Sequence, residues 1–310
     1  MTAIAAMPVN TVARSPEEVA KAADCAAGVA ASCAASVASH RCEIVEHRWV
    51  NARYKYLRLK AEAPLARITG CGQFYQLRCP ASAEQQPFLL RPMSVYGTGP
   101  EEGTVEFLYN VTGVGTRALA ALEAGDTMDI VGPLGNTFGF DPAYQRILVV
   151  ARGVGLATMA PLVRAAGAAG VGITALMSAR GPADLMREEF LRGVEADVRC
   201  VYDSDGSSSV EHVEILLREL IETQAPQAVY TCGSHRLLML LQRVLADYPV
   251  IRGEVAMEQR MACGMGVCLS CVRLFECGTG AGQSDKQFLR VCREGPVFPI
   301  HTVVGEVEFG

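Results

Sequence analysis

The spacing of hydrophobic and polar positions divides the chain into segments of different structural type. Between residues 43 and 140, short β-like runs alternate with Gly and Pro. The runs are CEIVEHRWV, YKYLRLKA, GQFYQLRCP, PFLLRPMSVYG, GTVEFLYNV and DTMDIVGPLG. Many short strands at close spacing are typical of a small antiparallel barrel. We therefore predict an antiparallel β-barrel domain over residues 43–142.

From Arg146 onward, strand-like and helix-like segments alternate. RILVVA leads into the helix-like MAPLVRAAGAAG and then the strand-like GITALMSA, and VRCVYD and QAVYTCG are further strands, each followed by a helix. This alternation indicates a parallel sheet with helices on both faces. The sequence predicts a nucleotide-binding α/β domain over residues 143–250 and a smaller module over residues 251–310.

Residues 1–42 form an Ala-rich extension whose pattern differs from those of the two predicted domains. Ser15 is a candidate N-cap, Pro16 suits the first helical position, and the two glutamates that follow complement the helix dipole. The run up to His40 thus resembles a helix. A partly disordered extension is the alternative, because alanine contributes little burial energy.

Charge and hydropathy exclude two classes of partner. The chain of 310 residues has 28 basic and 33 acidic side chains, and no stretch concentrates Lys and Arg as phosphate-backbone binding requires. No uninterrupted apolar run approaches 18 residues, and the N-terminus lacks a secretory signal pattern. We expect a soluble, cytoplasmic protein with no membrane span and no nucleic-acid partner.

Cysteine spacing carries the strongest chemical signal. The chain has 12 cysteines, and disulfides are disfavoured in the reducing cytosol, so clustered cysteines indicate metal ligation. In RMACGMGVCLSCVR, the residues Cys263, Cys268 and Cys271 have the spacing Cys-x4-Cys-x2-Cys, and Cys292 follows after 20 residues. This is the plant-type [2Fe-2S] pattern. Small residues between the ligands leave room for backbone N–H groups to approach the sulfurs.

Two alternatives accompany the iron-sulfur prediction. Structural zinc commonly uses two Cys-x2-Cys pairs or one pair with histidines, and only Cys268 and Cys271 form such a pair. Cys277 competes with Cys292 for the fourth position, but the short interval after Cys271 would force it back into the same loop. We therefore assign Cys277 as a bystander.

Two stretches of the predicted barrel are candidates for binding a flavin nucleotide. In RPMSVY, the Arg91 guanidinium can bridge pyrophosphate oxygens, and the Ser94 hydroxyl can reach a flavin ring nitrogen. In YNVTGVGT, the glycines Gly113 and Gly115, followed by Thr116, open a helix-like segment whose amides can receive a phosphate.

A dinucleotide site is expected in the α/β domain. ARGVGLATMAPL places Gly153 and Gly155 in the first strand-to-helix turn, although Thr158 stands at the last position of a full G-x-G-x-x-G. Cys232 and Gly233 end a later strand on the same edge of the sheet. Arg180 is a further candidate for contact with the adenosine ribose, or else a solvated surface residue.

These motifs, taken in order, resemble one family. RPMSVY with GVGT, ARGVGLATMAPL with TCGS, and ACGMGVCLSC with VCREGPVF are similar to the iron-sulfur flavoprotein electron-transfer subunits of heteromeric, NAD-dependent dihydroorotate dehydrogenases, which are related to ferredoxin reductases. The resemblance covers roughly residues 43–304. A related group, the small subunits of NADH-dependent ferredoxin:NADP oxidoreductases, differs in having Asp where Cys263 stands.

The resemblance implies a set of cofactors and a partner. FAD would be held by Arg91, Pro92, Met93 and Ser94 with Gly115 and Thr116 at its pyrophosphate, and Tyr109 and Gly113 complete this candidate set. It further implies NAD(P), a [2Fe-2S] cluster on the four cysteines, and a catalytic flavoprotein partner, an FMN-type dihydroorotate dehydrogenase of pyrimidine biosynthesis. Ala151 and Arg152 depart from the family pattern, which has a run of glycines there.

The order of the three modules is typical of a protein that converts a two-electron transfer into single-electron transfers. A nicotinamide transfers two electrons as hydride, a cluster accepts one, and a flavin between them can hold either. We expect an oxidoreductase subunit that needs no catalytic acid, base or nucleophile. A stand-alone NAD(P)H reductase feeding an oxygenase or another acceptor is the alternative, and a zinc-stabilised binding module without enzymatic activity is a third hypothesis.

Overall fold

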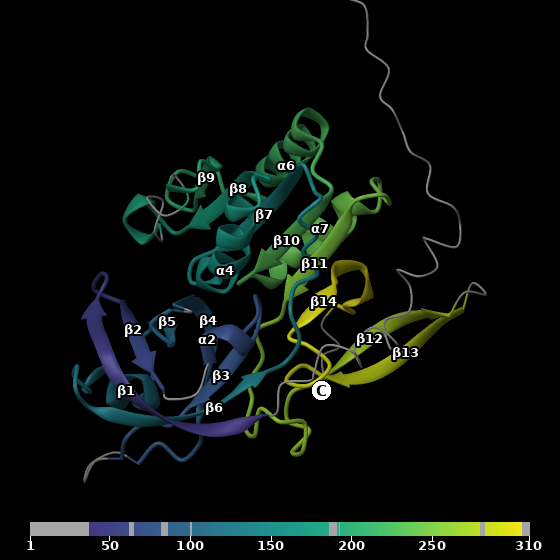
Figure 1. Cartoon of the computed structure of the whole chain (residues 1–310). Helices are drawn as coiled ribbons and strands as arrows, with labels where there is room; N and C mark the ends of the chain where they lie inside the picture. Colours follow the sequence, from purple (N-terminus) through teal and green to yellow (C-terminus); the bar gives the residue numbers. More distant parts are fainter. Residues whose placement is uncertain are drawn as a thin grey trace, which may run out of the picture.

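The first domain is a closed antiparallel barrel, as predicted. The computed structural model describes residues 37–61, 65–81, 86–99, 101–185, 191, 193–279 and 283–305. Six strands close in the order β1-β2-β5-β4-β3-β6 (Figure 1). They are β1 (Ala38–Trp49), β2 (Tyr54–Lys60), β3 (Phe74–Leu77), β4 (Arg91–Gly99), β5 (Thr104–Asn110) and β6 (Thr127–Leu134), with the short helices α2 (Leu65–Ile68) and α3 (Val114–Ala120) between them.

Apolar side chains from several strands fill the barrel. Leu57 and Leu59 on β2 pack with Tyr75 on β3 and Phe107 on β5, and all four are fully buried. The two leucines share one face of their strand because successive residues of a strand point to opposite faces.

Strand β1 begins earlier than the sequence patterns suggest. Residues 38–42 pair with β6, from Ala38 opposite Gly132 to Cys42 opposite Met128. Residues 38–40 are therefore strand, whereas we expected them in the Ala-rich helix and outside the barrel. Closing the barrel pairs the backbone groups of β6, and that requirement outweighs the helix propensity of alanine. The remainder of the expected helix lies in residues 1–36, outside the described residues.

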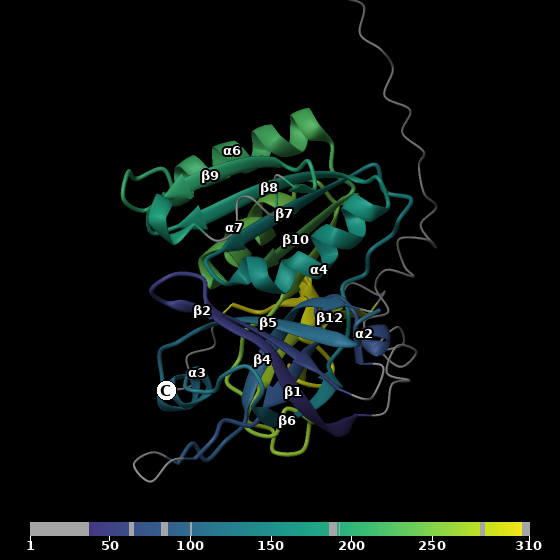
Figure 2. The same cartoon turned by 60° about the vertical axis from the view of Figure 1, so that its left-hand side comes forward.

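The second domain is a sheet with helices on both faces, which confirms the predicted α/β class. Its strand order is β14-β11-β10-β7-β8-β9. The parallel strands are β7 (Arg146–Arg152), β8 (Gly172–Ala179), β9 (Asp197–Tyr202), β10 (Ala228–Cys232) and β11 (Arg252–Ala256). Helix α4 (Gly155–Ala168) lies between the sheet and the barrel, whereas α6 (Val210–Gln224) and α7 (His235–Leu245) lie on the opposite face (Figure 2). The other helical elements among the described residues are the single-turn helices η2 (Pro182–Asp184) and η3 (Ile300–Thr302).

The sheet takes two strands from the segment that we expected to form a separate cysteine module. Strand β11 extends the parallel sheet, and β14 (Val297–Pro299) pairs antiparallel with β11 at the edge. The boundary expected at residue 250 therefore does not separate two independent units. The sheet is mixed, and its edge strand comes from the C-terminal segment.

A β-hairpin carries the cysteine loop beside the barrel. Strands β12 (Val272–Thr279) and β13 (Gln283–Arg290) pair antiparallel, and they extend away from the sheet (Figure 1). Phe275 is fully buried and packs against Phe298 of β14, with ring centroids 4.1 Å apart. This contact ties the hairpin to the α/β sheet. No helix in the described part of the chain is long and apolar enough to cross a membrane.

Removing a core side chain of the barrel should destabilise the protein. Leu57→Ala replaces a fully buried leucine, so we expect a loss of about 2–5 kcal/mol from the free energy of unfolding, because a cavity remains. Urea unfolding followed by circular dichroism measures the change. Ile215→Ala, on α6 where the side chain is 68% exposed, should change stability by no more than about 0.5 kcal/mol. Equal losses in both variants would contradict the assigned core.

Candidate flavin, nucleotide and iron-sulfur sites

All three parts of the fold meet at one cleft of about 290 Å³. The barrel contributes residues of β3, β4 and β5, the α/β domain contributes the first turn of α4, and the chain after β11 contributes residues 257–261. Of the residues expected to bind cofactors, this cleft is lined by Pro92, Met93, Ser94 and Tyr109. A single planar group bound here would contact all three parts of the molecule.

The walls of the cleft suit a flavin ring. Pro92 and Met93 offer apolar surface, and Ser94 offers a hydroxyl. The side-chain oxygen of Asn110 is buried and has no hydrogen-bond partner among the described residues. Buried acceptors are normally satisfied, and the ring N–H of a flavin is a donor of the required kind. The residues present therefore fit the cofactor that the motifs imply.

Tyr109 is held in the cleft wall by the partly buried His47 of β1. His47 Nδ1 lies 2.8 Å from the Leu122 carbonyl oxygen, which can only accept, so this nitrogen carries the hydrogen. The Tyr109 hydroxyl then donates to His47 Nε2 over 2.8 Å. Burial lowers the pKa of His47 to about 4, and burial raises the pKa of Tyr109 above its usual range. Both side chains are neutral at pH 7, so this wall of the cleft carries no charge from either of them.

Sequence reasoning did not find several residues of the cleft. They are Asn110, Thr158, Met257, Glu258, Met261 and Pro296, among others. Burial raises the pKa of the Glu258 carboxyl, so the cleft contains a carboxyl group that retains its proton more strongly than usual. Met257 and Glu258 lie outside every motif, and the other four lie within motifs in which different residues were singled out as ligands. The six come together only when the three parts pack.

The expected pyrophosphate residues meet outside the cleft lining. The Arg91 guanidinium lies so close to Gly115 that a Cβ there would stand 2.5 Å from Nε. Helix α3 starts after Gly113, and the Thr116 hydroxyl accepts hydrogen bonds from the backbone N–H groups of Thr112 and Gly113 at 2.9 and 3.0 Å. The planar, positively charged guanidinium of Arg91, beside the N-terminus of a helix, can bind a pyrophosphate. The two stretches that we paired from sequence are thus adjacent in space.

The glycine turns of the α/β domain interlock at the carboxyl edge of the sheet. A Cβ on Gly155 would lie 2.4 Å from the Cys232 carbonyl oxygen, and one on Gly233 would lie 2.6 Å from the Arg152 carbonyl oxygen. Gly233 also has a φ of +92°, which favours glycine. Gly153 has a φ of +55° in the same turn. Cys232 is buried, and its contact with a bound nucleotide stays a prediction.

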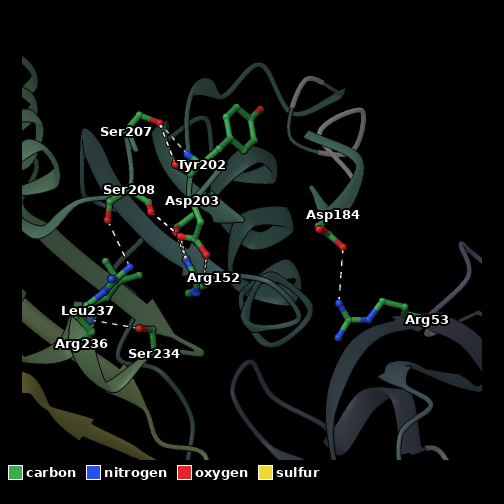
Figure 3. A network of polar contacts seen from close by, with 11 residues as sticks. Arg53, Arg152, Asp184, Tyr202, Asp203, Ser207, Ser208, Ser234, Arg236 and Leu237 are labelled. Carbon is green, nitrogen blue, oxygen red and sulfur yellow. Dashed lines mark hydrogen bonds and ion pairs between the residues drawn. The ribbon is translucent and has the colours of Figure 1, made fainter. Parts of the chain in front are cut away.

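A polar network spans the same edge of the sheet at the ends of β7, β8 and β9 (Figure 3). Arg152 donates to both carboxylate oxygens of Asp203, at 3.2 and 2.6 Å, and to Ser178 Oγ at 2.7 Å. The hydrogen bonds from Arg152 and Ser208 lower the pKa of Asp203 to about 2. Asp203 is therefore ionised throughout the physiological range. The sequence offers Arg180 for this region, or else as a solvated surface residue, and it does not single out Asp203, which ends the strand-like run VRCVYD.

The four cysteines of the motif lie together at the base of the hairpin. Their side chains contact one another in two pairs, Cys263 with Cys268 and Cys271 with Cys292. Within the described residues, no three His, Cys, Asp or Glu side chains converge as the ligands of one metal ion. Two pairs of thiolates are the arrangement that a two-iron cluster requires, with one pair on each iron. Cys277 instead lies on β12, opposite Asp285 of β13.

Backbone N–H groups point at these sulfurs. Gly266 donates to Cys292 Sγ at 3.1 Å, and Met265 donates to Cys263 Sγ at 3.3 Å. Gly266 also has a φ of +80°, a conformation that glycine adopts without strain. Hydrogen bonds from Ser270 lower the pKa of the exposed Cys268 thiol to about 6, whereas burial raises the pKa of Cys292. Such donors stabilise the negative charge of a bound cluster.

The barrel, the mixed sheet and the cysteine loop around one cleft define a protein of the ferredoxin-reductase fold with a cysteine-bearing module. The structure of an NADH-dependent reduced ferredoxin-NADP oxidoreductase superposes with a TM-score of 0.67 at 24% identity, over 85% of this chain and 90% of the other. A ferredoxin reductase of carbazole 1,9a-dioxygenase superposes with a TM-score of 0.55 at 20% identity, over 69% of this chain and 67% of the other.

Sequence comparison narrows the class to one family. Residues 258–304 match the model of the iron-sulfur cluster binding domain of dihydroorotate dehydrogenase B. The electron transfer subunit of dihydroorotate dehydrogenase B (NAD(+)) from Streptococcus thermophilus is 31% identical over 84% of this chain and 96% of its own length. The subunit of the same name from Desulforamulus reducens is 30% identical over 80% and 92%. The chain belongs to the family of dihydroorotate dehydrogenase B electron transfer subunits.

The interlocked glycine turns give a testable requirement for nucleotide binding. Gly155→Ala places a methyl group against the Cys232 carbonyl and should separate the two turns, so we expect NADH affinity to fall by at least about tenfold. Flavin content should not change. Titration of the purified protein with NADH under anaerobic conditions measures the affinity. Gly193→Ala is the matched control, since nothing lies within 4 Å of a Cβ there. Unchanged NADH affinity in Gly155→Ala would contradict the assignment.

Proposed function

We propose that the chain transfers electrons between NAD(H) and a separate catalytic flavoprotein, by way of bound FAD and a [2Fe-2S] cluster. The observation that carries the proposal is the single cleft at which the barrel, the first turn of α4 and the segment before the cysteine loop meet. A flavin ring in that cleft is reached by a nicotinamide from one side and adjoins the cluster module on another. The partner is a dihydroorotate dehydrogenase of the FMN type, acting in pyrimidine biosynthesis.

FAD fits the barrel side of the cleft. Met93 and Ser94 would face the ring, Asn110 would accept from its N–H, and Arg91 with the Gly115 turn would bind the pyrophosphate. The bound flavin supplies the exchange between a two-electron hydride and single electrons. The chain supplies orientation, an apolar surrounding and the fixed wall at Tyr109, where the hydroxyl donates to neutral His47.

The cluster loop would form the contact with the partner. Cys263, Cys268, Cys271 and Cys292 are the proposed ligands, and Cys268 is exposed at the surface. Val267 and Leu269 on either side of it are 79% and 59% exposed. Exposed apolar side chains around an electron carrier fit the docking of a second protein, and this placement gives single electrons a short route out.

The ionised Asp203 supports a preference for NAD over NADP. A carboxylate at the end of a strand on this edge can accept from the ribose hydroxyls of NAD and repels the 2′-phosphate of NADP. Arg152 holds the carboxylate in place through two hydrogen bonds. The names of the curated relatives specify NAD(+).

A cytoplasmic location agrees with the state of the cysteines. All cysteines among the described residues are free thiols, and a reducing compartment preserves both free thiols and thiolate ligands. We propose a cytoplasmic location, in an assembly with the partner subunit.

A stand-alone NAD(P)H reductase is the second candidate. The structural likeness to a ferredoxin reductase of carbazole 1,9a-dioxygenase favours it. The two candidates differ in whether the chain forms a stable complex. Affinity purification of this chain, with its partners left untagged, would separate the two candidates. Recovery of an FMN-containing dehydrogenase with the chain supports the subunit role, and recovery of none supports the stand-alone reductase.

Anaerobic purification with cofactor analysis tests both candidates together. We expect about one flavin and about two irons per chain. Colourless protein with zinc and no flavin would overturn both and would support the zinc-stabilised binding module instead.

The choice of the fourth cluster ligand can be tested by substitution. Cys292→Ser should lower iron content by at least about half, because it removes one of two thiolates on an iron. Cys277→Ser should leave iron content unchanged, since Cys277 lies within β12, paired with Asp285 of β13, and not in the cysteine loop. Iron analysis of both proteins, purified in parallel, gives the result. Normal iron in Cys292→Ser with loss in Cys277→Ser would exchange the roles of the two residues.

Substitution of Asp203 tests the cofactor preference. Asp203→Asn removes the charge that opposes a 2′-phosphate, so the ratio of NADH to NADPH efficiency should fall by at least about tenfold. Asp205→Asn is the matched control, because Asp205 bonds only the nearby Ser207 among the contacts described. Steady-state reduction of a dye acceptor with each nucleotide measures the ratio. A ratio that falls equally in both variants would contradict a specific role for Asp203.

A further inference from the structure

One buried glutamine joins the flavin-binding barrel to the cysteine loop. Gln76 is a residue of β3, and its side chain is fully buried. On one side it stands opposite Pro92 of β4, a residue of the cleft wall. On the other side its amide faces the backbone of Ala262 and Gly264, which flank Cys263. Gln76 therefore adjoins both proposed redox sites.

The contact with the loop is close enough to restrict its sequence. A Cβ on Gly264 would lie 2.5 Å from Gln76 Nε2 and 2.8 Å from its Cγ. Gly264 also has a φ of +72°. The loop backbone thus lies directly on the glutamine amide, and glycine is the residue that allows this approach.

The side-chain amide of Gln76 makes few hydrogen bonds for a group that is fully buried. Its oxygen has no hydrogen-bond partner among the described residues. Among the described residues, its nitrogen reaches only the Ala262 carbonyl oxygen, at 3.5 Å, which is a weak bond. A leucine would fill the same space without the free-energy cost of burying an amide. A purely structural role therefore does not explain a glutamine at this position.

The neighbouring Gln73 shows what a structural glutamine looks like in the same strand region. Gln73 is also buried, and its oxygen accepts from the Gly70 N–H at 2.8 Å while its nitrogen donates to the Gly135 carbonyl at 2.8 Å. Both ends of that amide are satisfied within the barrel. Gln76 differs in that its nitrogen end points toward a loop that carries a proposed ligand.

We propose that Gln76 is a positioning residue that holds the Cys263 end of the cysteine loop against the barrel and raises the reduction potential of the cluster. This inference rests on the proposed function. The N–H end of the amide presents partial positive charge to the backbone beside Cys263. Positive charge there stabilises the additional electron of the reduced cluster, and a buried site screens that interaction weakly.

The experiment is a redox titration of the cluster in the holoprotein, followed by electron paramagnetic resonance. Gln76→Leu and Gln76→Met remove the amide with little change in side-chain size. We expect the midpoint potential of the cluster to shift to a more negative value in both variants, with flavin content at the level of the unmodified protein. Loss of iron with retention of flavin would also support the proposal, since it shows a loop that is no longer held.

Gln73→Leu is the control, because it removes a buried amide that does not face the loop. It should lower thermal stability and leave the cluster potential unchanged. A potential in both Gln76 variants equal to that of the unmodified protein, at full iron content, would overturn the inference alone. Parallel loss of flavin and iron in both variants would also overturn it, because Gln76 would then support the fold as a whole and not the cysteine loop in particular. Absence of any cluster signal in the unmodified protein would overturn the proposed function as well.

Discussion

The packing of helix α4 against strand β4 determines how the α/β domain lies on the barrel. Arg164 on α4 donates to the Tyr96 carbonyl oxygen at 2.6 Å, and its guanidinium lies 4.9 Å from the centre of the Tyr96 ring. The helix also contributes most of its buried residues to the core shared with the sheet. Because one helix contacts both domains, the carboxyl edge of the sheet is fixed above the strand that carries Pro92, Met93 and Ser94. The nucleotide and flavin sites therefore face each other.

The C-terminal segment closes the third side of the cleft through a second set of contacts. Asn136, after the last barrel strand, donates to the carbonyls of Glu294 and Val297 and accepts from the Val297 N–H at 2.9 Å. Phe275 packs on Phe298 within the same segment. These contacts join the barrel, the sheet and the hairpin around residues 257–261. An electron carrier on the cysteine loop would thereby be held close to the cleft.

Local sequence patterns predicted the elements of this structure well. The barrel strands, the βα alternation and the cysteine spacing each depend on residues close together in the chain, and each was recovered. The motifs around Arg91 and Gly115 were also paired correctly in space, since the guanidinium lies against that glycine. Such predictions succeed because period and spacing reflect local backbone geometry.

Features that depend on contacts between distant segments were missed. The start of β1 at Ala38 is determined by pairing with β6, and the assignment of β11 and β14 to the sheet is determined by parallel and edge pairing. Asp203, Glu258 and Gln76 carry no motif, and each acquires its property from burial or from a partner far along the chain. Arg152 looked like a mere departure from a glycine run, yet it holds Asp203.

One chain that holds both a two-electron carrier and a one-electron carrier takes up electrons in a characteristic number, which a reductive titration measures. The purified, oxidised protein is titrated anaerobically with dithionite, and then with NADH, while absorption and electron paramagnetic resonance are recorded. We predict uptake of about three electrons per chain, two by the flavin and one by the cluster, with NADH reducing both carriers. Uptake of only about two electrons, or reduction of the flavin by NADH without any cluster signal, would contradict the account.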